Sequence, residues 1–107
     1  MAKTGVLDVG LLVGGRLSRS VAGNTDVTLN QSEYENRIQE YTGALTGNIN
    51  VIVPLTDGAE WLIYNNTSGA FTLTVKGATG TGIAVGQGKR ALLYCDGTNV
   101  VRATADV

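Results

Sequence analysis

The glycine-rich segment Gly86–Ala91 is the part of this chain that most resembles a nucleotide-binding loop. Its residues, Gly-Gln-Gly-Lys-Arg-Ala, fit the loose dinucleotide pattern GxGxxA. That pattern binds a pyrophosphate because a helix begins there and its N-terminal N–H groups hold the phosphates. Here the following residues, Ala91–Cys95, are typical of a β-strand. A P-loop is also excluded, since Ile83 and Arg90 stand where the motif needs a glycine and a hydroxyl residue. We therefore expect no nucleotide site.

The carboxylates are the other residues that could carry chemistry, and their positions favour structural roles. Glu33, Glu35 and Glu40 lie near one another in a polar segment, where solvated charges are expected. Asp57 and Asp96 each precede a glycine, a pairing that forms turns. The chain has no His, which is the usual general base and the commonest metal ligand. No loop gathers the oxygen donors that calcium needs. We therefore expect no enzyme activity, no cofactor and no metal site.

The chain holds a single cysteine, Cys95, so an intrachain disulfide and a cysteine-based metal site are both excluded. Cys95 ends the apolar run Ala91–Cys95, which predicts a small buried hydrophobic residue rather than a reactive thiol.

Composition limits the class of protein further. The chain has 107 residues, enough for one domain, and its eight basic and nine acidic residues give a net charge of −1. A nucleic-acid partner is not expected, because it would require a basic face. Charged residues make up only 16% of the chain, against roughly 25% in an average globular protein. A surface this poor in charge suggests that a protein partner covers part of it.

The N-terminus predicts neither secretion nor membrane insertion. Asp8 and several glycines interrupt the apolar stretch that a signal peptide needs. No apolar run approaches the roughly 20 residues of a membrane span. We therefore expect synthesis in the cytoplasm and no membrane partner.

Short strands separated by turns predict an all-β fold. From Asp26 onward, strand-like segments follow one another at the spacing that is typical of a sandwich or barrel. The segment Asn30–Asn36 is polar, and Asn30 or Ser32 could cap a single helical turn there. Asn65–Gly69 and Asp96–Gly97 are hairpin signals. We predict an antiparallel β-sandwich or jelly-roll-like domain of about eight short strands, spanning residues 25–107.

Residues 1–24 differ from the rest of the chain, because glycines divide their apolar residues into short pieces. This pattern predicts an extended N-terminal arm that lies along another surface, since a segment this apolar would be a liability if it were exposed to solvent. The alternative is that the segment is simply the first strand of the domain. The candidate interface residues of the arm are Leu11, Leu12, Val13, Arg16 and Arg19.

Two aromatic residues are further interface candidates. Trp61 and Tyr64 lie on opposite faces of one predicted strand, so at most one of them belongs to the core. The other could anchor an interface, where Trp and Tyr are enriched. The alternative is that both are half-buried packing residues.

The segment from Thr42 to Val101 resembles a small β-module found in virion proteins of tailed bacteriophages. Three sequence stretches carry this resemblance: TGALTGNINV from Thr42, YNNT from Tyr64, and GKR from Gly88 followed by YCDGTNVV from Tyr94. The module occurs in tail-fibre and tail-tip chains and in short stand-alone structural proteins. The resemblance implies a structural role and carries no catalytic residues with it.

Three functions are consistent with these observations. The first is a capsid decoration, or cement, protein that is located in the virion, forms a homotrimer and binds the major capsid protein or another virion protein. A chain this short has no room for a fibre shaft, and its apolar arm suits contact with a capsid surface. The second is a tail-fibre or tail-tip component that takes part in receptor binding. The third is a soluble carbohydrate-binding module, for which the chain has few aromatic residues.

Overall fold

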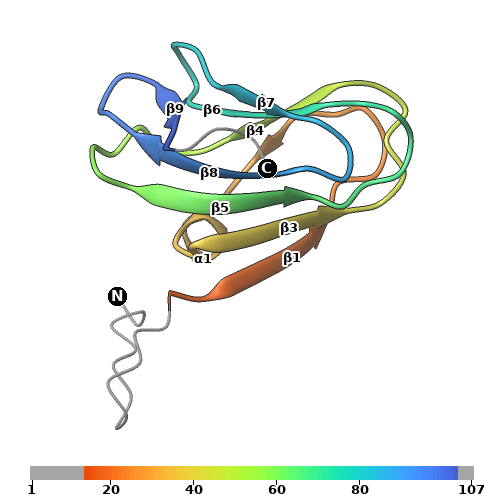
Figure 1. The fold of residues 1–107 in the computed structure, drawn as a ribbon, viewed down its shortest axis with the longest axis horizontal. Helices are drawn as coiled ribbons and strands as arrows, with labels where there is room; N and C mark the ends of the chain where they lie inside the picture. Colours follow the sequence, from red (N-terminus) through yellow and green to blue (C-terminus); the bar gives the residue numbers. More distant parts are fainter. Residues whose placement is uncertain (1–13, 104–107) are drawn as a thin grey trace, which may run out of the picture.

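Nine short strands and one helical turn make up residues 14–103, the part of the chain that this computed structural model describes (Figure 1). The elements in chain order are β1 (Arg16–Ser20), β2 (Val27–Thr28), α1 (Gln31–Tyr34), β3 (Ile38–Thr42), β4 (Ile49–Ile52), β5 (Glu60–Asn65), β6 (Leu73–Lys76), β7 (Ile83–Val85), β8 (Arg90–Cys95) and β9 (Val100–Arg102). This all-β architecture confirms the predicted fold class.

The strands form two facing sheets, and from β1 to β6 the chain passes from one sheet to the other with each new strand. The five-stranded sheet has the order β1-β3-β5-β8-β9, and the four-stranded sheet has the order β2-β4-β6-β7. β1, β3 and β5 are parallel neighbours, and so are β2, β4 and β6. The pairs β1–β2, β3–β4 and β5–β6, each with one strand in each sheet, are therefore three rungs of a parallel β-solenoid. Figure 1 shows β1, β3 and β5 side by side in this order.

Successive rungs are in register because equivalent residues recur at an almost constant interval. Val27 lies opposite Val51, and Val51 lies opposite Val75, in each case 24 positions further on. Val51 and Val75 are fully buried, and a valine buried in this way contributes roughly 1.5–2 kcal/mol. A rung cannot bury its inner face alone, so the stacking of these columns produces the core.

The C-terminal part of the chain reverses direction and closes one end of the stack. β7 pairs antiparallel with β6, β8 with β5, and β9 with β8. The hairpin between β8 and β9 confirms the turn predicted at Asp96–Gly97. Gly97 has φ +93°, a conformation that glycine adopts readily. The carboxylate of Asp96 accepts hydrogen bonds from the N–H groups of Thr98 and Asn99, which lower the pKa of this carboxyl group.

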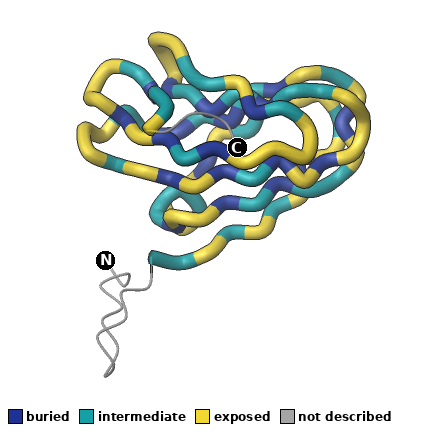
Figure 2. Tube along the Cα trace, viewed as in Figure 1, coloured by how far each residue is buried: buried dark blue, intermediate teal, exposed yellow. Residues whose placement is uncertain are grey.

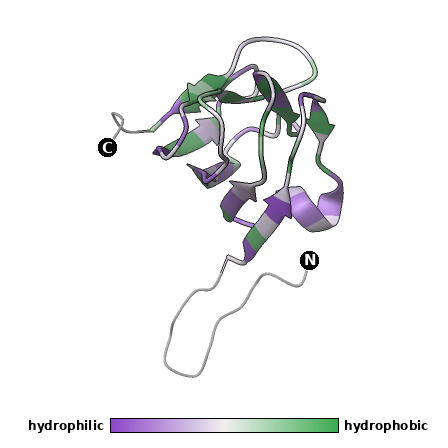
Figure 3. Cartoon of the chain, turned by 90° about the vertical axis from the view of Figure 1, so that its right-hand side faces the viewer, coloured by the Kyte–Doolittle hydropathy of each residue, from purple (hydrophilic) through white to green (hydrophobic). Residues whose placement is uncertain are grey.

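The helical turn α1 begins where the sequence predicts it. The side chain of Asn30 accepts a hydrogen bond from the N–H of Glu33, and Glu33 reaches back to the N–H of Asn30. This reciprocal capping box stabilises a helix that is too short to persist alone. α1 is hydrophilic (Figure 3) and forms the corner between the first rung and the second.

Side chains of one rung also form hydrogen bonds with the backbone of the next rung. The carboxylate of Asp26 accepts a hydrogen bond of 2.9 Å from the N–H of Asn50, and the side-chain oxygen of Asn48 accepts one of 2.9 Å from the N–H of Thr72. Each donor follows its acceptor by 24 positions. The bond from Asn50 holds the pKa of Asp26 below its ordinary value of 3.8.

Acid should therefore weaken the contact between the first two rungs. Because the folded state lowers the pKa of Asp26, the stabilisation is present above pH 3.8 and is lost as the pH falls through the folded-state value. We expect the melting temperature of the protein to fall more steeply below this pH than that of Asp26→Asn, which keeps the acceptor oxygen but does not titrate. Equal slopes in calorimetric scans of the two proteins would contradict this role for Asp26.

Two predictions about the fold require correction. The antiparallel arrangement was wrong for β1–β6, whose neighbours within each sheet are parallel. Parallel neighbours need a long crossover, and here the second sheet provides it in place of a helix. Asn65–Gly69 is a corner between β5 and β6, which lie in different sheets, and not a hairpin.

The boundary between arm and domain was also placed too late. Arg16–Ser20, assigned to the arm, is β1 and pairs with β3 along its whole length. For this part of residues 1–24 the alternative interpretation, a first strand of the domain, is the correct one. Residues 1–13 lie outside the described residues.

Candidate interaction surface

The described residues contain no group of three or more His, Cys, Asp or Glu side chains that could hold a metal ion. The segment Gly86–Ala91 leads through a turn at Gly88 into β8, so no helix begins there to bind a phosphate. Cys95 is fully buried, as predicted. No helix among residues 14–103 is long and apolar enough to cross a membrane.

Apolar side chains gather on the outer face of the five-stranded sheet. Ile38 lies opposite Leu62, and Leu62 lies opposite Leu92, so the three residues form a row across β3, β5 and β8. Tyr94 follows Leu92 by two positions and therefore shares its face. Ile38 is 42% exposed, Leu62 36% and Tyr94 39%. We call Ile38, Leu62, Leu92 and Tyr94 the outer patch.

A polar row runs beside the outer patch on the same face. Glu40 lies opposite Tyr64, and Tyr64 lies opposite Arg90. The Arg90 guanidinium stacks over the Tyr64 ring, 3.7 Å from its centroid. Glu40 accepts a hydrogen bond of 2.8 Å from the Asn66 amide and forms an ion pair with Arg16. The hydrogen bond from Asn66, with the charge of Arg16, lowers the pKa of Glu40. An apolar row flanked by Tyr, Arg and a carboxylate is typical of a protein interface.

The structure divides the predicted interface residues between two faces. Arg16 and Tyr64 lie on the outer face of the five-stranded sheet, close to the outer patch. Arg19 and Trp61 turn inward, and Arg19 forms a 3.0 Å ion pair with Glu33. The remaining candidates, Leu11, Leu12 and Val13, lie outside the described residues.

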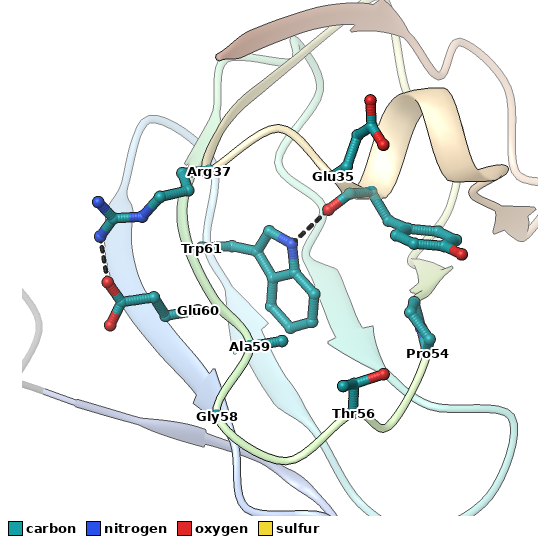
Figure 4. A pocket seen from close by; sticks show the side chains of 9 residues that line it. Glu35, Arg37, Pro54, Thr56, Gly58, Ala59, Glu60 and Trp61 are labelled. Atoms are coloured by element: carbon teal, nitrogen blue, oxygen red, sulfur yellow. Dashed lines mark hydrogen bonds and ion pairs between the residues drawn. The ribbon is translucent and has the colours of Figure 1, made fainter. Parts of the chain in front are cut away.

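Trp61 is the core member of the Trp61–Tyr64 pair. It is 3% exposed, and its Nε1–H donates a hydrogen bond of 2.8 Å to the carbonyl of Tyr34. Trp61 also lines a cavity of about 500 Å³ between α1 and the loop before β5, with the Arg37–Glu60 ion pair at one side (Figure 4). Trp61 therefore does not present its ring to a partner, whereas Tyr64 lies on the surface.

A second cavity, of about 270 Å³, connects the outer patch with the beginning of the described chain. Gly14, Gly15 and Arg37 line it together with Ile38, Leu62 and Leu92 of the outer patch. The carbonyl groups of Gly14 and Gly15 accept hydrogen bonds from the N–H groups of Arg37 and Ile38. The described part of the chain therefore begins beside the outer patch.

Sequence reasoning missed the outer patch. Ile38, Leu62 and Leu92 are far apart in the sequence and meet only because of the strand register. The interval between Ile38 and Leu62 is the signal that could have found them, since it matches the interval between Val27 and Val51.

Comparison with known proteins gives no relative: no family model, no curated protein and no solved structure matches this chain.

Proposed function

We propose that this chain is a structural protein of a tailed-bacteriophage virion, where it decorates and stabilises the assembled capsid. The observation that carries the proposal is the outer patch, an exposed apolar row bordered by Arg16, Tyr64 and Arg90 on one face of a rigid sheet. Exposed apolar groups in such a setting mark a surface that binds another protein. The resemblance of the segment from Thr42 to Val101 to a phage virion module supports the identity of that partner.

The proposed function can be tested on phage particles that lack this protein. A protein that binds only the assembled shell stabilises it by RT ln(1 + [L]/Kd) at each site, about 2.7 kcal/mol at a hundredfold excess over Kd. Particles that lack the protein should therefore release DNA at a lower temperature, measured by dye fluorescence on heating, and should still adsorb to cells. Normal heat resistance with failed adsorption would contradict capsid decoration and indicate a tail component.

A substitution in the outer patch tests which surface makes the contact. Leu62→Asp places a charge in the centre of the apolar row and should weaken binding to depleted particles at least thirtyfold, roughly the loss expected for an interface hot spot. Ala84→Asp is the matched control, because Ala84 is exposed on β7 of the other sheet. Equal binding by the two variants in a sedimentation assay would exclude the outer patch as the contact.

A further inference from the structure

The end of the stack formed by the first rung has open strand edges. β1 pairs only with β3, and β2 pairs only with β4, among the strands that the structure describes. Both unpaired edges belong to the same rung and so lie at the same end. An unpaired edge offers a row of backbone donors and acceptors to another strand, and solenoids require a cap at such an end.

Burial indicates that a layer is missing from this end. The inward-facing residues Leu17, Arg19 and Val27 of the first rung are only half-buried. The residues that follow them in the same columns are fully buried, namely Gln39, Tyr41, Val51, Ile63, Asn65 and Val75. β1 and β2, the two strands of the first rung, contain no buried residue (Figure 2). A strand that carries apolar side chains on one face would cover Leu17 and Val27 and would pair with the open edge.

The arm contains a segment with this pattern. Leu7, Val9, Leu11 and Val13 alternate with other residues, so in an extended chain they share one face. Leu12 belongs to the opposite face, with Asp8 and Gly10. Alternation over seven residues is the pattern of a half-buried β-strand.

The first described residues of the chain lie on the β3 side of β1. The carbonyl oxygens of Gly14 and Gly15 accept hydrogen bonds from the N–H groups of Arg37 and Ile38, and both glycines line the cavity beside the outer patch. A Cβ placed at Gly14 would lie 2.6 Å from the Arg37 side chain, so Gly14 and Arg37 are in close contact. β3 lies on the side of β1 that faces away from the open edge.

We propose that residues 7–13 of a second copy of this chain add as a strand to the open edge of β1. The added strand pairs with the backbone of β1 and places Leu7, Val9, Leu11 and Val13 over the half-buried side chains of the first rung, a form of β-augmentation. Donation from copy to copy is head-to-tail and closes into a ring when the rotation permits. Three copies, the number predicted from the sequence, would fill the open β1 edge of each copy. This inference does not rest on the virion assignment.

A matched pair of arm variants tests the proposal by light scattering of the full-length protein. The wild type should have about three chain masses at micromolar concentration. Leu11→Asp should give monomers, whereas Leu12→Asp, on the opposite face of the same strand, should keep the wild-type mass. A monomeric wild type, or the same mass for both variants, would overturn the proposal.

The acceptor edge is tested by Ser18→Pro. The N–H of Val21 donates to the carbonyl of Thr42, beside β1. Successive N–H groups of a strand point to opposite edges, and Ser18 is an odd number of positions from Val21. The N–H of Ser18 therefore points toward the open edge. Proline at this position should block an added strand and keep the pairing with β3. Ser18→Pro should therefore be monomeric, with a cooperative melting transition that shows it is folded.

A mixture of the two defective variants tests the roles of the arm and of the edge separately. Leu11→Asp keeps an intact edge and Ser18→Pro keeps an intact arm, so their mixture should form a one-to-one dimer. A synthetic peptide of residues 5–15 should bind Leu11→Asp and not Ser18→Pro. If the mixture stays monomeric, or if the peptide binds both variants equally, the open edge is not the acceptor.

Discussion

Tyr41→Ala should lower the free energy of unfolding by about 4 kcal/mol, the loss typical of a buried aromatic residue truncated to alanine. Tyr41 is fully buried in the central rung, between Arg19 of β1 and Asn65 of β5. Truncation would leave a cavity that the rungs on either side cannot fill, because their positions are fixed by backbone pairing. A domain of this size has a total stability of about 5–15 kcal/mol, so the variant would be close to unfolding.

Tyr41→Phe separates the ring from the hydroxyl group. The hydroxyl donates a hydrogen bond of 2.6 Å to the side-chain oxygen of Gln39, which is also fully buried, and burial raises the pKa of Tyr41. Loss of the hydroxyl should cost about 1–2 kcal/mol, because Gln39 would keep a buried acceptor without a partner. Urea denaturation measures both variants. A loss below 1 kcal/mol for Tyr41→Ala would contradict the placement of Tyr41 in the core.

Local patterns in the sequence were sufficient to locate most of the strands. Leu73 and Val75 alternate with polar residues, and both are fully buried in β6 as that alternation predicts. The helical turn after Asn30 and the hairpin at Asp96–Gly97 follow from capping and turn preferences that act over a few residues. These features depend on neighbours in the sequence, and a single sequence contains that information.

The path of the chain between the two sheets depends on contacts with residues one rung away. Local sequence patterns do not show these contacts. Asn65–Gly69 has the composition of a hairpin turn, but the chain uses it to pass between the sheets. Asn65 is fully buried there, and its amide donates to the carbonyl of Val85 at 2.8 Å, a contact that only the assembled fold provides. The recurrence of Val27, Val51 and Val75 is the clearest signal of the rungs, and most other columns hold unlike residues.

The residues of the candidate surface could also be predicted only in part from local sequence patterns. Arg16 and Tyr64 were predicted as interface residues from their types, and both lie on the outer face of the five-stranded sheet. Trp61 was a candidate on equal grounds, and the strand places it inside. Which face a residue occupies is decided by the register of its strand, and residue type alone does not determine the register.

Gly69 lies at the corner where the chain passes from β5 in one sheet to β6 in the other. Gly69→Ala should lower the free energy of unfolding by about 3 kcal/mol, for two reasons that add. Gly69 has φ +88°, which a residue with a Cβ adopts at a cost of about 1 kcal/mol. A Cβ there would also lie 2.5 Å from the carbonyl oxygen of Leu45, a backbone atom of the neighbouring rung. The corner would have to move away from that rung to relieve the contact.

Gly58→Ala is the matched control for this substitution. Gly58 has nearly the same φ, +86°, and a Cβ there would meet no atom within 4 Å. The backbone cost and the gain from a less flexible unfolded chain are the same in both variants, so they cancel in the comparison. The remaining difference, about 2 kcal/mol by urea denaturation, measures how closely the corners of successive rungs pack. Equal losses for the two variants would show that the rungs can separate at their corners, and the solenoid would then depend on its sheets alone.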